Sequence, residues 1–121
     1  MNSSDLAIEQ YLALRPSNFS ILVRFEICQY LDPVNDICIL ALHIDLRSDR
    51  ANDPTLHLSF YGVHGLRLAL PTLSQIRLSP IEIRSIRERQ WERLNYEVKV
   101  TEDTSLAFLC DRFEFRLERQ V

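Results

Sequence analysis

Apolar and polar residues alternate along most of this chain, and the alternation begins at residue 21. Ahead of it, residues 5–14 repeat apolar side chains at helical spacing, with Asp5 placed to cap the first turn. Pro16 ends the helix, because the residue before a proline is pushed out of the helical region. The apolar positions on the expected helix face are Ala7, Ile8, Tyr11, Leu12 and Leu14. The pattern therefore predicts one short helix ahead of a strand-rich chain.

Two long strands are expected first, at residues 21–28 and 37–46. The second is apolar on both faces near its start, which favours a central place in a sheet or cover by the N-terminal helix. Shorter alternating segments follow at residues 56–61, 66–70, 76–78, 81–86, 96–100, 106–110 and 113–117.

Two features interrupt the alternation. Gly62 and Gly65, the only glycines, lie in the middle of one alternating stretch and predict a bulge, a tight turn or a close backbone approach. The alternation also slips by one residue at Asp111-Arg112, which again predicts a bulge or a tight turn.

The order of elements gives the fold class. No helical segment separates consecutive strands, so parallel βαβ units are disfavoured. We expect a mainly β (α+β) fold, with one short N-terminal helix and then about seven or eight antiparallel strands in a meander, sandwich or open barrel. At 121 residues with 46% hydrophobic composition, residues 1–121 are expected to form a single domain.

Charge and cysteine content narrow the functional classes. The formal net charge of −3 gives no overall attraction for nucleic acid or anionic membrane, so neither is expected as a partner. The three cysteines are widely spaced without a C-x-x-C motif, which indicates reduced thiols and a cytoplasmic protein. The first residues lack a secretory signal, and the longest apolar stretch is too short to span a bilayer.

The residues able to do chemistry match no catalytic or metal-binding pattern. His57 and His64 flank the glycine-containing segment, but their spacing to Asp45 or to the cysteines fits no known metal site. Neither a G-x-S-x-G turn nor a phosphate-binding glycine loop occurs. We therefore expect no cofactor, no metal and no enzyme activity.

Two segments are candidate surfaces for binding another protein. In the first, Asp45, Asp49 and Asp53 recur every four residues in and just before a polar loop. The spacing does not fit a calcium loop, so a solvated acidic loop facing a basic partner is the better interpretation.

The second segment, residues 84–96, mixes arginines and glutamates with aromatic residues. The glutamates disfavour single-stranded nucleic acid, whereas such a mixture suits a protein–protein contact. Its candidate contact residues are Arg84, Arg87, Trp91 and Tyr96.

Two alternatives stay open. A small-molecule binding module would hold its ligand between the sheet and the N-terminal helix, with His57, Tyr61 and His64 as the polar lining. An enzyme of unrecognised type would need histidine, aspartate and serine side chains clustered in a cleft.

One stretch of the chain resembles a known group. The order Leu56-x-Leu58-x-Phe60-x-x-Val63-x-x-Leu66-x-Leu68, then Trp91-Glu92, Tyr96-x-Val98 and Phe108-x-Cys110, resembles small bacterial β-domain proteins, some grouped with predicted immunity proteins of polymorphic toxin systems. The resemblance covers residues 55–117 and brings no catalytic residues. It implies a non-enzymatic protein that binds a partner and covers a toxin's basic active site. Exposed sheet edges also make a homodimer a candidate assembly.

Overall fold

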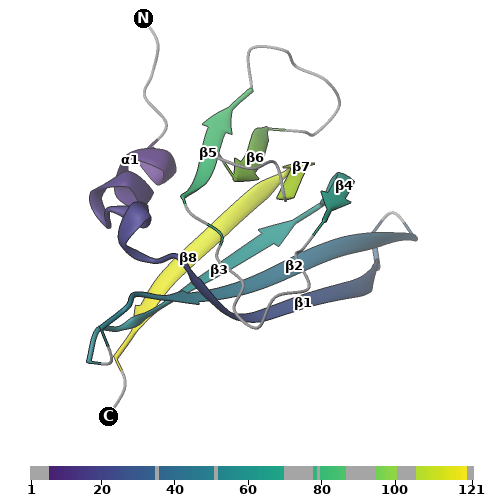
Figure 1. The fold of residues 1–121 in the computed structure, drawn as a ribbon. Helices are drawn as coiled ribbons and strands as arrows, with labels where there is room; N and C mark the ends of the chain where they lie inside the picture. The colour runs from purple at the N-terminus through teal and green to yellow at the C-terminus, as the bar shows by residue number, and fades with distance from the viewer. Residues whose placement is uncertain are drawn as a thin grey trace, which may run out of the picture.

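The computed structural model describes residues 6–34, 36–50, 52–69, 78, 80–86, 95–100 and 106–119. One helix, one turn of 3-10 helix and eight strands occur in these residues (Figure 1). In chain order they are α1 (Leu6–Ala13), η1 (Pro16–Asn18), β1 (Ile21–Asp32), β2 (Ile37–Arg47), β3 (Thr55–Tyr61), β4 (His64–Leu68), β5 (Ile81–Ser85), β6 (Tyr96–Val100), β7 (Leu106–Cys110) and β8 (Arg112–Glu118). The expected fold class is confirmed.

The strands form two four-stranded sheets in which every paired neighbour is antiparallel. Sheet A has the order β1-β2-β3-β8, and sheet B has the order β4-β7-β6-β5. The long strand β2 lies between β1 and β3, which confirms the central position expected from its apolar faces. In Figure 1, sheet B lies above sheet A and α1 lies to one side.

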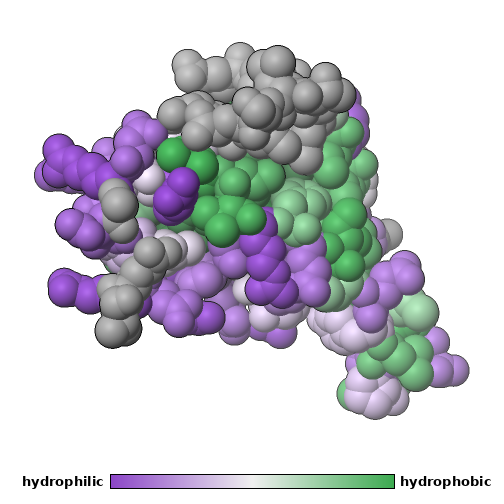
Figure 2. Space-filling model, turned by 60° about the horizontal axis from the view of Figure 1, so that its bottom comes forward, coloured by the Kyte–Doolittle hydropathy of each residue, from purple (hydrophilic) through white to green (hydrophobic). Residues whose placement is uncertain are grey.

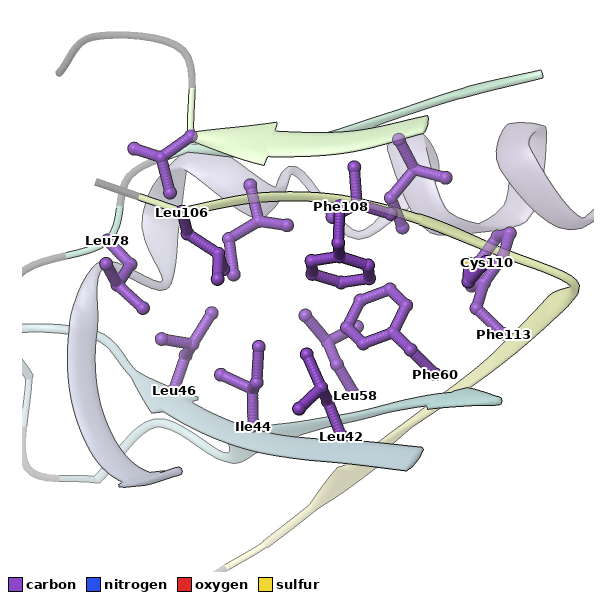
Figure 3. Close-up of a cluster of buried hydrophobic side chains, with 14 of the residues drawn as sticks. Leu42, Ile44, Leu46, Leu58, Phe60, Leu78, Leu106, Phe108, Cys110 and Phe113 are labelled. Atoms are coloured by element: carbon purple, nitrogen blue, oxygen red, sulfur yellow. The ribbon is translucent and has the colours of Figure 1, made fainter. Parts of the chain in front are cut away.

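The core lies between the two sheets, because alternation turns every second side chain of each strand inward. Leu42, Ile44 and Leu46 of β2 are at most 1% exposed, and they point toward the side chains of β7 (Figure 3). The rings of Phe60 on β3 and Phe108 on β7 meet edge to face, with centroids 5.0 Å apart. Burial of these side chains is the main stabilising contribution to the fold.

Helix α1 packs against the sandwich through Tyr11, which is 1% exposed. The Tyr11 ring lies edge-on to Phe113 and Phe115, and its hydroxyl donates a 2.6 Å hydrogen bond to the carbonyl of Ile81. Burial raises the pKa of this hydroxyl above its usual range. The expectation that Leu12 widens the buried face is wrong: it follows Tyr11 by one position, lies on another side of the helix and is 58% exposed. Asp5 lies outside the described residues.

Two strand connections cross between the sheets side by side, and we call this point the corner. Strand β3 continues into β4 through Gly62, and β7 continues into β8 through Asp111. Gly62 has φ +68°, and a Cβ added there would lie 2.8 Å from the Cβ of Asp111. The Asp111 amide donates to the Tyr61 carbonyl at 3.0 Å, and the Asn95 side-chain amide donates to the Asp111 carbonyl at 2.9 Å.

The corner confirms both interruptions expected from the sequence. The close backbone approach is at Gly62, and the phase slip at position 111 marks the step from one sheet to the other. Gly65, with φ +65°, lies where the pairing of β4 with β7 shifts register, as a bulge requires.

The end of the β1–β2 hairpin projects beyond the rest of sheet A. Strand β3 pairs with β2 only from Ala41 to Leu46, whereas β1 and β2 stay paired out to Asp32 and Ile37. We call residues 27–40 the arm; it reaches to the right in Figure 1 and forms the lower right of Figure 2.

Large hydrophobic side chains are exposed on the arm, as Figure 2 shows. They are Ile27, Tyr30, Leu31, Val34 and Ile37, with exposed fractions between 40% and 86%. The alternation at residues 21–28 predicts one apolar face made of Ile21, Val23, Phe25 and Ile27. Two of these positions are wrong: Ile27 is half-exposed because sheet B does not extend over this end of the hairpin, and Val23 is 55% exposed at the irregularity between Leu22 and Arg24.

Candidate functional site

The side of sheet A that faces away from the core carries polar side chains from all four of its strands. We call this surface the open face. It comprises Arg24, Glu26, His43, Asp45, His57, Ser59, Tyr61, Arg112, Glu114, Arg116 and Glu118. Its arginine and glutamate side chains are 43–66% exposed.

Strand register brings these residues together from distant parts of the chain. On β2 and β3, Asp45 lies opposite His57, and β8 places Arg116 on the other side of His57. Because side chains alternate, the neighbours two positions along each strand share the same face. The leucines and phenylalanines between them point into the core. The same alternation therefore produces both the open face and the core-facing side of sheet A.

A histidine held between two carboxylates lies at the centre of the open face. The Nδ1 atom of His57 is 2.6 Å from Asp45 Oδ1, and its Nε2 atom is 2.7 Å from Glu118 Oε1. Asp45 is only 8% exposed, so its carboxylate relies on this contact and on Arg24, whose Nη1 lies 3.9 Å away. When the ring donates to both carboxylates it carries both protons and a positive charge.

A second histidine forms a separate pair. The Nδ1 atom of His43 lies 2.9 Å from the hydroxyl oxygen of Ser59. A serine bonded to a histidine is the starting geometry of nucleophilic catalysis, in which a carboxylate then orients the histidine. Here the carboxylate of Asp45 is bonded to His57 instead. The serine–histidine and histidine–aspartate contacts are thus two separate pairs.

Arginine and tyrosine extend the face along β8. The guanidinium of Arg112 lies 4.1 Å from the centre of the Tyr61 ring, a cation–π contact. The Tyr61 hydroxyl donates to Glu114 Oε1 at 3.4 Å, and Arg112 Nη1 lies 3.3 Å from the other oxygen of that carboxylate. These contacts hold a ring and a guanidinium in place at the surface.

The open face is hollowed around His57 and mixed in charge. A shallow depression of about 280 Å³ is lined by Arg24, Glu26, His43, Asp45, His57, Ser59 and Arg116. Exposed Arg47, two positions beyond Asp45 on β2, adds a fourth arginine to the same side, so arginines and carboxylates are equal in number and interspersed. A polyanion requires a net cationic surface, whereas interspersed charges suit a protein partner.

The expected acidic surface is not one patch in the structure. Asp45 lies on the open face, while Asp49 and Asp53 lie in the loop between β2 and β3. Asp53 accepts a 2.7 Å hydrogen bond from the Ser48 hydroxyl, and its amide donates to the Arg50 carbonyl at 3.2 Å. The three carboxylates therefore have different local roles, although they recur evenly in the sequence.

The arginine-rich segment is also divided. Arg84 is exposed on β5 and pairs with Glu97 of β6. Tyr96 is 4% exposed and meets Phe113 edge to face at 4.9 Å, so it is a core residue, inaccessible to a partner. The expectation that Tyr96 contacts a partner is therefore wrong, because Tyr96 occupies an inward-facing position of β6. Arg87 and Trp91 lie outside the described residues.

The three residues considered for a ligand do not line a pocket beside the helix. His57 and Tyr61 lie on the open face, whereas α1 packs on the inner side, where Tyr11 meets the inward-facing Phe113 and Phe115. His64 is exposed on β4 in sheet B. Within the described ranges, no three His, Cys, Asp or Glu side chains are arranged to hold a metal ion.

The structure adds contact residues that sequence reasoning did not single out. They are Arg24, His43, Ser59, Arg112, Glu114, Arg116 and Glu118. The sequence feature that could have identified them is the set of polar residues that alternate with the apolar residues of each strand. What the sequence lacks is the pairing of β3 with β8, which joins residues 57 and 116 across about half of the chain.

Comparison with known proteins decides the family. A family model described as Immunity protein PIM8 matches residues 4–116. This chain belongs to the PIM8 immunity protein family. The resemblance to immunity proteins is thereby confirmed, and the match takes in the corner, the arm and all of the open face except Glu118 of this PIM8 chain. No curated protein and no solved structure matches it.

The PIM8 family assignment indicates a protein–protein interaction role. In the part of the chain that the structure describes, no helix is long and apolar enough to cross a membrane.

Proposed function

We propose that this PIM8 protein neutralises a toxin by binding it through the open face and blocking it, without catalysing a reaction. The observation that carries the proposal is the set of paired side chains around His57 and Tyr61 on an exposed sheet surface. Family membership supplies the class of partner, since immunity proteins act on toxins. We further propose that the binding takes place in the cytoplasm of the bacterium that makes the toxin.

The open face has the physical properties of a specific protein-binding surface. Tyr and Arg are the residues that most often dominate binding energy at interfaces, and the contact between Arg112 and Tyr61 positions one of each. A side chain already held in its bound conformation loses little entropy on association. Buried Asp45 and half-buried His57 at the centre add polar groups that a wrong partner would leave unsatisfied.

The charge pattern indicates the chemistry of the toxin surface. Arginines and carboxylates balance on this side of sheet A, and the whole chain carries a net charge of −3. The complementary surface is therefore weakly basic, with acidic groups placed to meet the arginines. Salt should slow association with such a partner, because long-range steering between charged surfaces is screened.

The test takes a toxin found among the neighbouring genes and measures its affinity for this protein by titration calorimetry. Tyr61→Ala removes the ring under Arg112 and should weaken binding by about tenfold or more. The matched control is Arg84→Ala, which removes an exposed arginine of sheet B and should leave affinity unchanged. If the control variant weakens binding and Tyr61→Ala does not, the toxin uses sheet B and the proposal fails.

A second experiment separates binding from chemistry. Ser59→Ala removes the hydroxyl beside His43 while leaving the pairing of Asp45 with His57. If neutralisation is by binding, the variant still protects cells that express the toxin, in proportion to its affinity. Loss of protection with affinity retained would instead make Ser59 a nucleophile.

A further inference from the structure

The outer edge of β1 is the longest exposed sheet edge in the described structure. Strand β1 has twelve residues and ends sheet A on one side, whereas the other three edge strands have seven, five and five. Half of its backbone N–H and C=O groups point away from β2, as in any edge strand. Proteins blunt such edges with prolines, lysines or bulges.

The edge is regular where it passes into the arm. The one irregularity in the β1–β2 pairing lies between Leu22 and Arg24, so residues 24–32 pair without a break. That stretch contains no proline, glycine or lysine. Ile27 and Leu31 on it are at least half exposed. A two-stranded ribbon with exposed apolar residues is only marginally stable in water, so the arm gains from a covering partner.

We propose that two copies of this chain pair β1 to β1, antiparallel, with Cys28 of each copy on the two-fold axis. Antiparallel pairing of identical edges puts residues of the same parity opposite each other, because both must present the same backbone groups. In this register, Arg24 lies opposite Asp32 of the second copy, and Glu26 lies opposite its Tyr30. Each pair occurs twice, giving two ion pairs and two carboxylate–hydroxyl contacts.

The same register pairs the apolar residues. Phe25 lies opposite Leu31 of the second copy on the core side of the sheet, and Ile27 lies opposite its Gln29. Arg24 and Asp32 already have partners within one chain, Glu26 and Asp45 for the guanidinium and the Val34 amide for the carboxylate. A carboxylate has room for several donors and a guanidinium has five N–H groups, so the new contacts add to the existing ones.

Neighbouring registers lack this complementarity. If Glu26 lay on the two-fold axis, the Glu26 carboxylates of the two copies would face each other. If Gln29 lay on the axis, Glu26 would face Asp32 of the second copy. With Ile27 on the axis, neither Glu26 nor Asp32 would face a positively charged or hydroxyl-bearing side chain. A centre at Phe25 pairs Arg24 with Glu26 but leaves most of the arm uncovered. Like charges directly opposite are destabilising, so the register centred on Cys28 is favoured.

The consequence is one continuous eight-stranded sheet with both open faces on the same side. The two-fold axis runs through the sheet at right angles, so the proposed toxin-binding surfaces of both copies point the same way. The dimer does not depend on the proposed function, because it is built on the backbone edge of sheet A and is measured without the toxin. Arg24 and Glu26 are the two open-face residues that also contribute to it.

Native cysteines allow a direct test with a short bis-maleimide crosslinker. Cys28 is half-buried, Cys38 is exposed on β2 and Cys110 is buried. Directly opposed Cβ atoms on antiparallel strands are about 5 Å apart. Cys38→Ser, which leaves Cys28 as the accessible thiol, should give crosslinked dimer. Cys28→Ser should not, and crosslinking through Cys38 alone would overturn the register.

Charge exchange tests the pairing itself, with the dimer followed by light scattering over a concentration series. Arg24→Asp and Asp32→Arg each put like charges opposite and should weaken the dimer by about tenfold. The double variant restores opposite charges and should dimerise as the native chain does. If Asp32→Arg only weakened the turn at Val34, the double variant would stay impaired. A monomer of 14.2 kDa at every concentration would overturn the proposal.

Discussion

The two halves of the β1–β2 hairpin have the same sequence pattern and opposite environments. Toward its C-terminal end, β2 lies between β1 and β3 under sheet B, and Ile44 there is fully buried. In the arm, β2 has β1 alone as its paired neighbour, and Ile27 of β1, which faces the same side of the sheet as Ile44, is 50% exposed. Alternation specifies a strand with one apolar face, but burial depends on what lies across from it. We expect the covered half to determine stability and the arm to determine association.

The sharpest way to break this comparison is to make one substitution in both halves. Ile44→Ala leaves a cavity in a core that cannot fully collapse and should lower the free energy of unfolding by about 2–5 kcal/mol. Ile27→Ala removes a side chain on the same face that is already half in water, and should lower it by about 1 kcal/mol or less. Urea denaturation monitored by circular dichroism measures both. Similar losses would mean that the arm packs against something as firmly as the core does.

The corner offers a second matched pair of substitutions. Gly62→Ala forces a side chain into a left-handed conformation and against Asp111, and should destabilise by about 2 kcal/mol or more. Gly65→Ala has the same backbone strain but an added Cβ meets no atom within 4 Å, so it should cost about 1 kcal/mol. The difference between the two losses of stability measures the steric contact between position 62 and Asp111. Equal midpoints in thermal unfolding would contradict the close approach.

At high pH, ionisation of the cysteine thiols should affect stability differently in the core, at Cys110, and in the arm, at Cys38. Burial, with a smaller effect from the Asp111 charge, raises the pKa of Cys110 to about 12 from 9.0. The unfolded thiol loses its proton first, so this contribution to stability is complete below pH 9 and declines as pH rises toward 12. The urea concentration at which half the protein is unfolded should fall as pH rises from 8 to 11. The fall should be less steep in Cys110→Ala than in the native chain. The control is Cys38→Ala in the exposed arm, and equal slopes for both variants would refute the assignment.

The smallest effect is expected in local dynamics, without any change in overall stability. Amides of the arm should exchange with deuterium faster than those of residues 41–46, because fewer packed side chains oppose local opening. Hydrogen-exchange mass spectrometry at low and high protein concentration would test this. In the proposed dimer, β1 amides become protected as concentration rises. Protection of β1 independent of concentration would show that the edge is covered within one chain.

Local pattern was enough to predict most strands and the inner faces of the well-buried ones. Alternation identified β2, β3, β6 and β7, and the slip at position 111 marked the step between sheets, since a change of sheet changes which side is inward.

Long-range pairing could not be predicted in the same way. His57 contacts Glu118, 61 residues away, and only the register of β3 with β8 brings the two together. Tyr96 resembled a surface aromatic because its neighbours in sequence are charged, yet its position in β6 turns it inward. The exposure of Ile27 was equally hidden, because a sequence does not state where the covering strands of the other sheet stop.

The place of β8 beside β3 bears on how the chain folds as it is synthesised. Strands β1, β2 and β3 can pair as soon as they emerge, because short connections join them. The outer side of β3 then stays unpaired until residues 112–118 arrive, and the aromatic Phe113 is absent from the core until the same moment. Distant contacts of this kind slow folding and leave apolar surface exposed in the interval. The open face needs β8 to be complete, so a ribosome-bound chain that stops short of β8 should be unable to protect its cell.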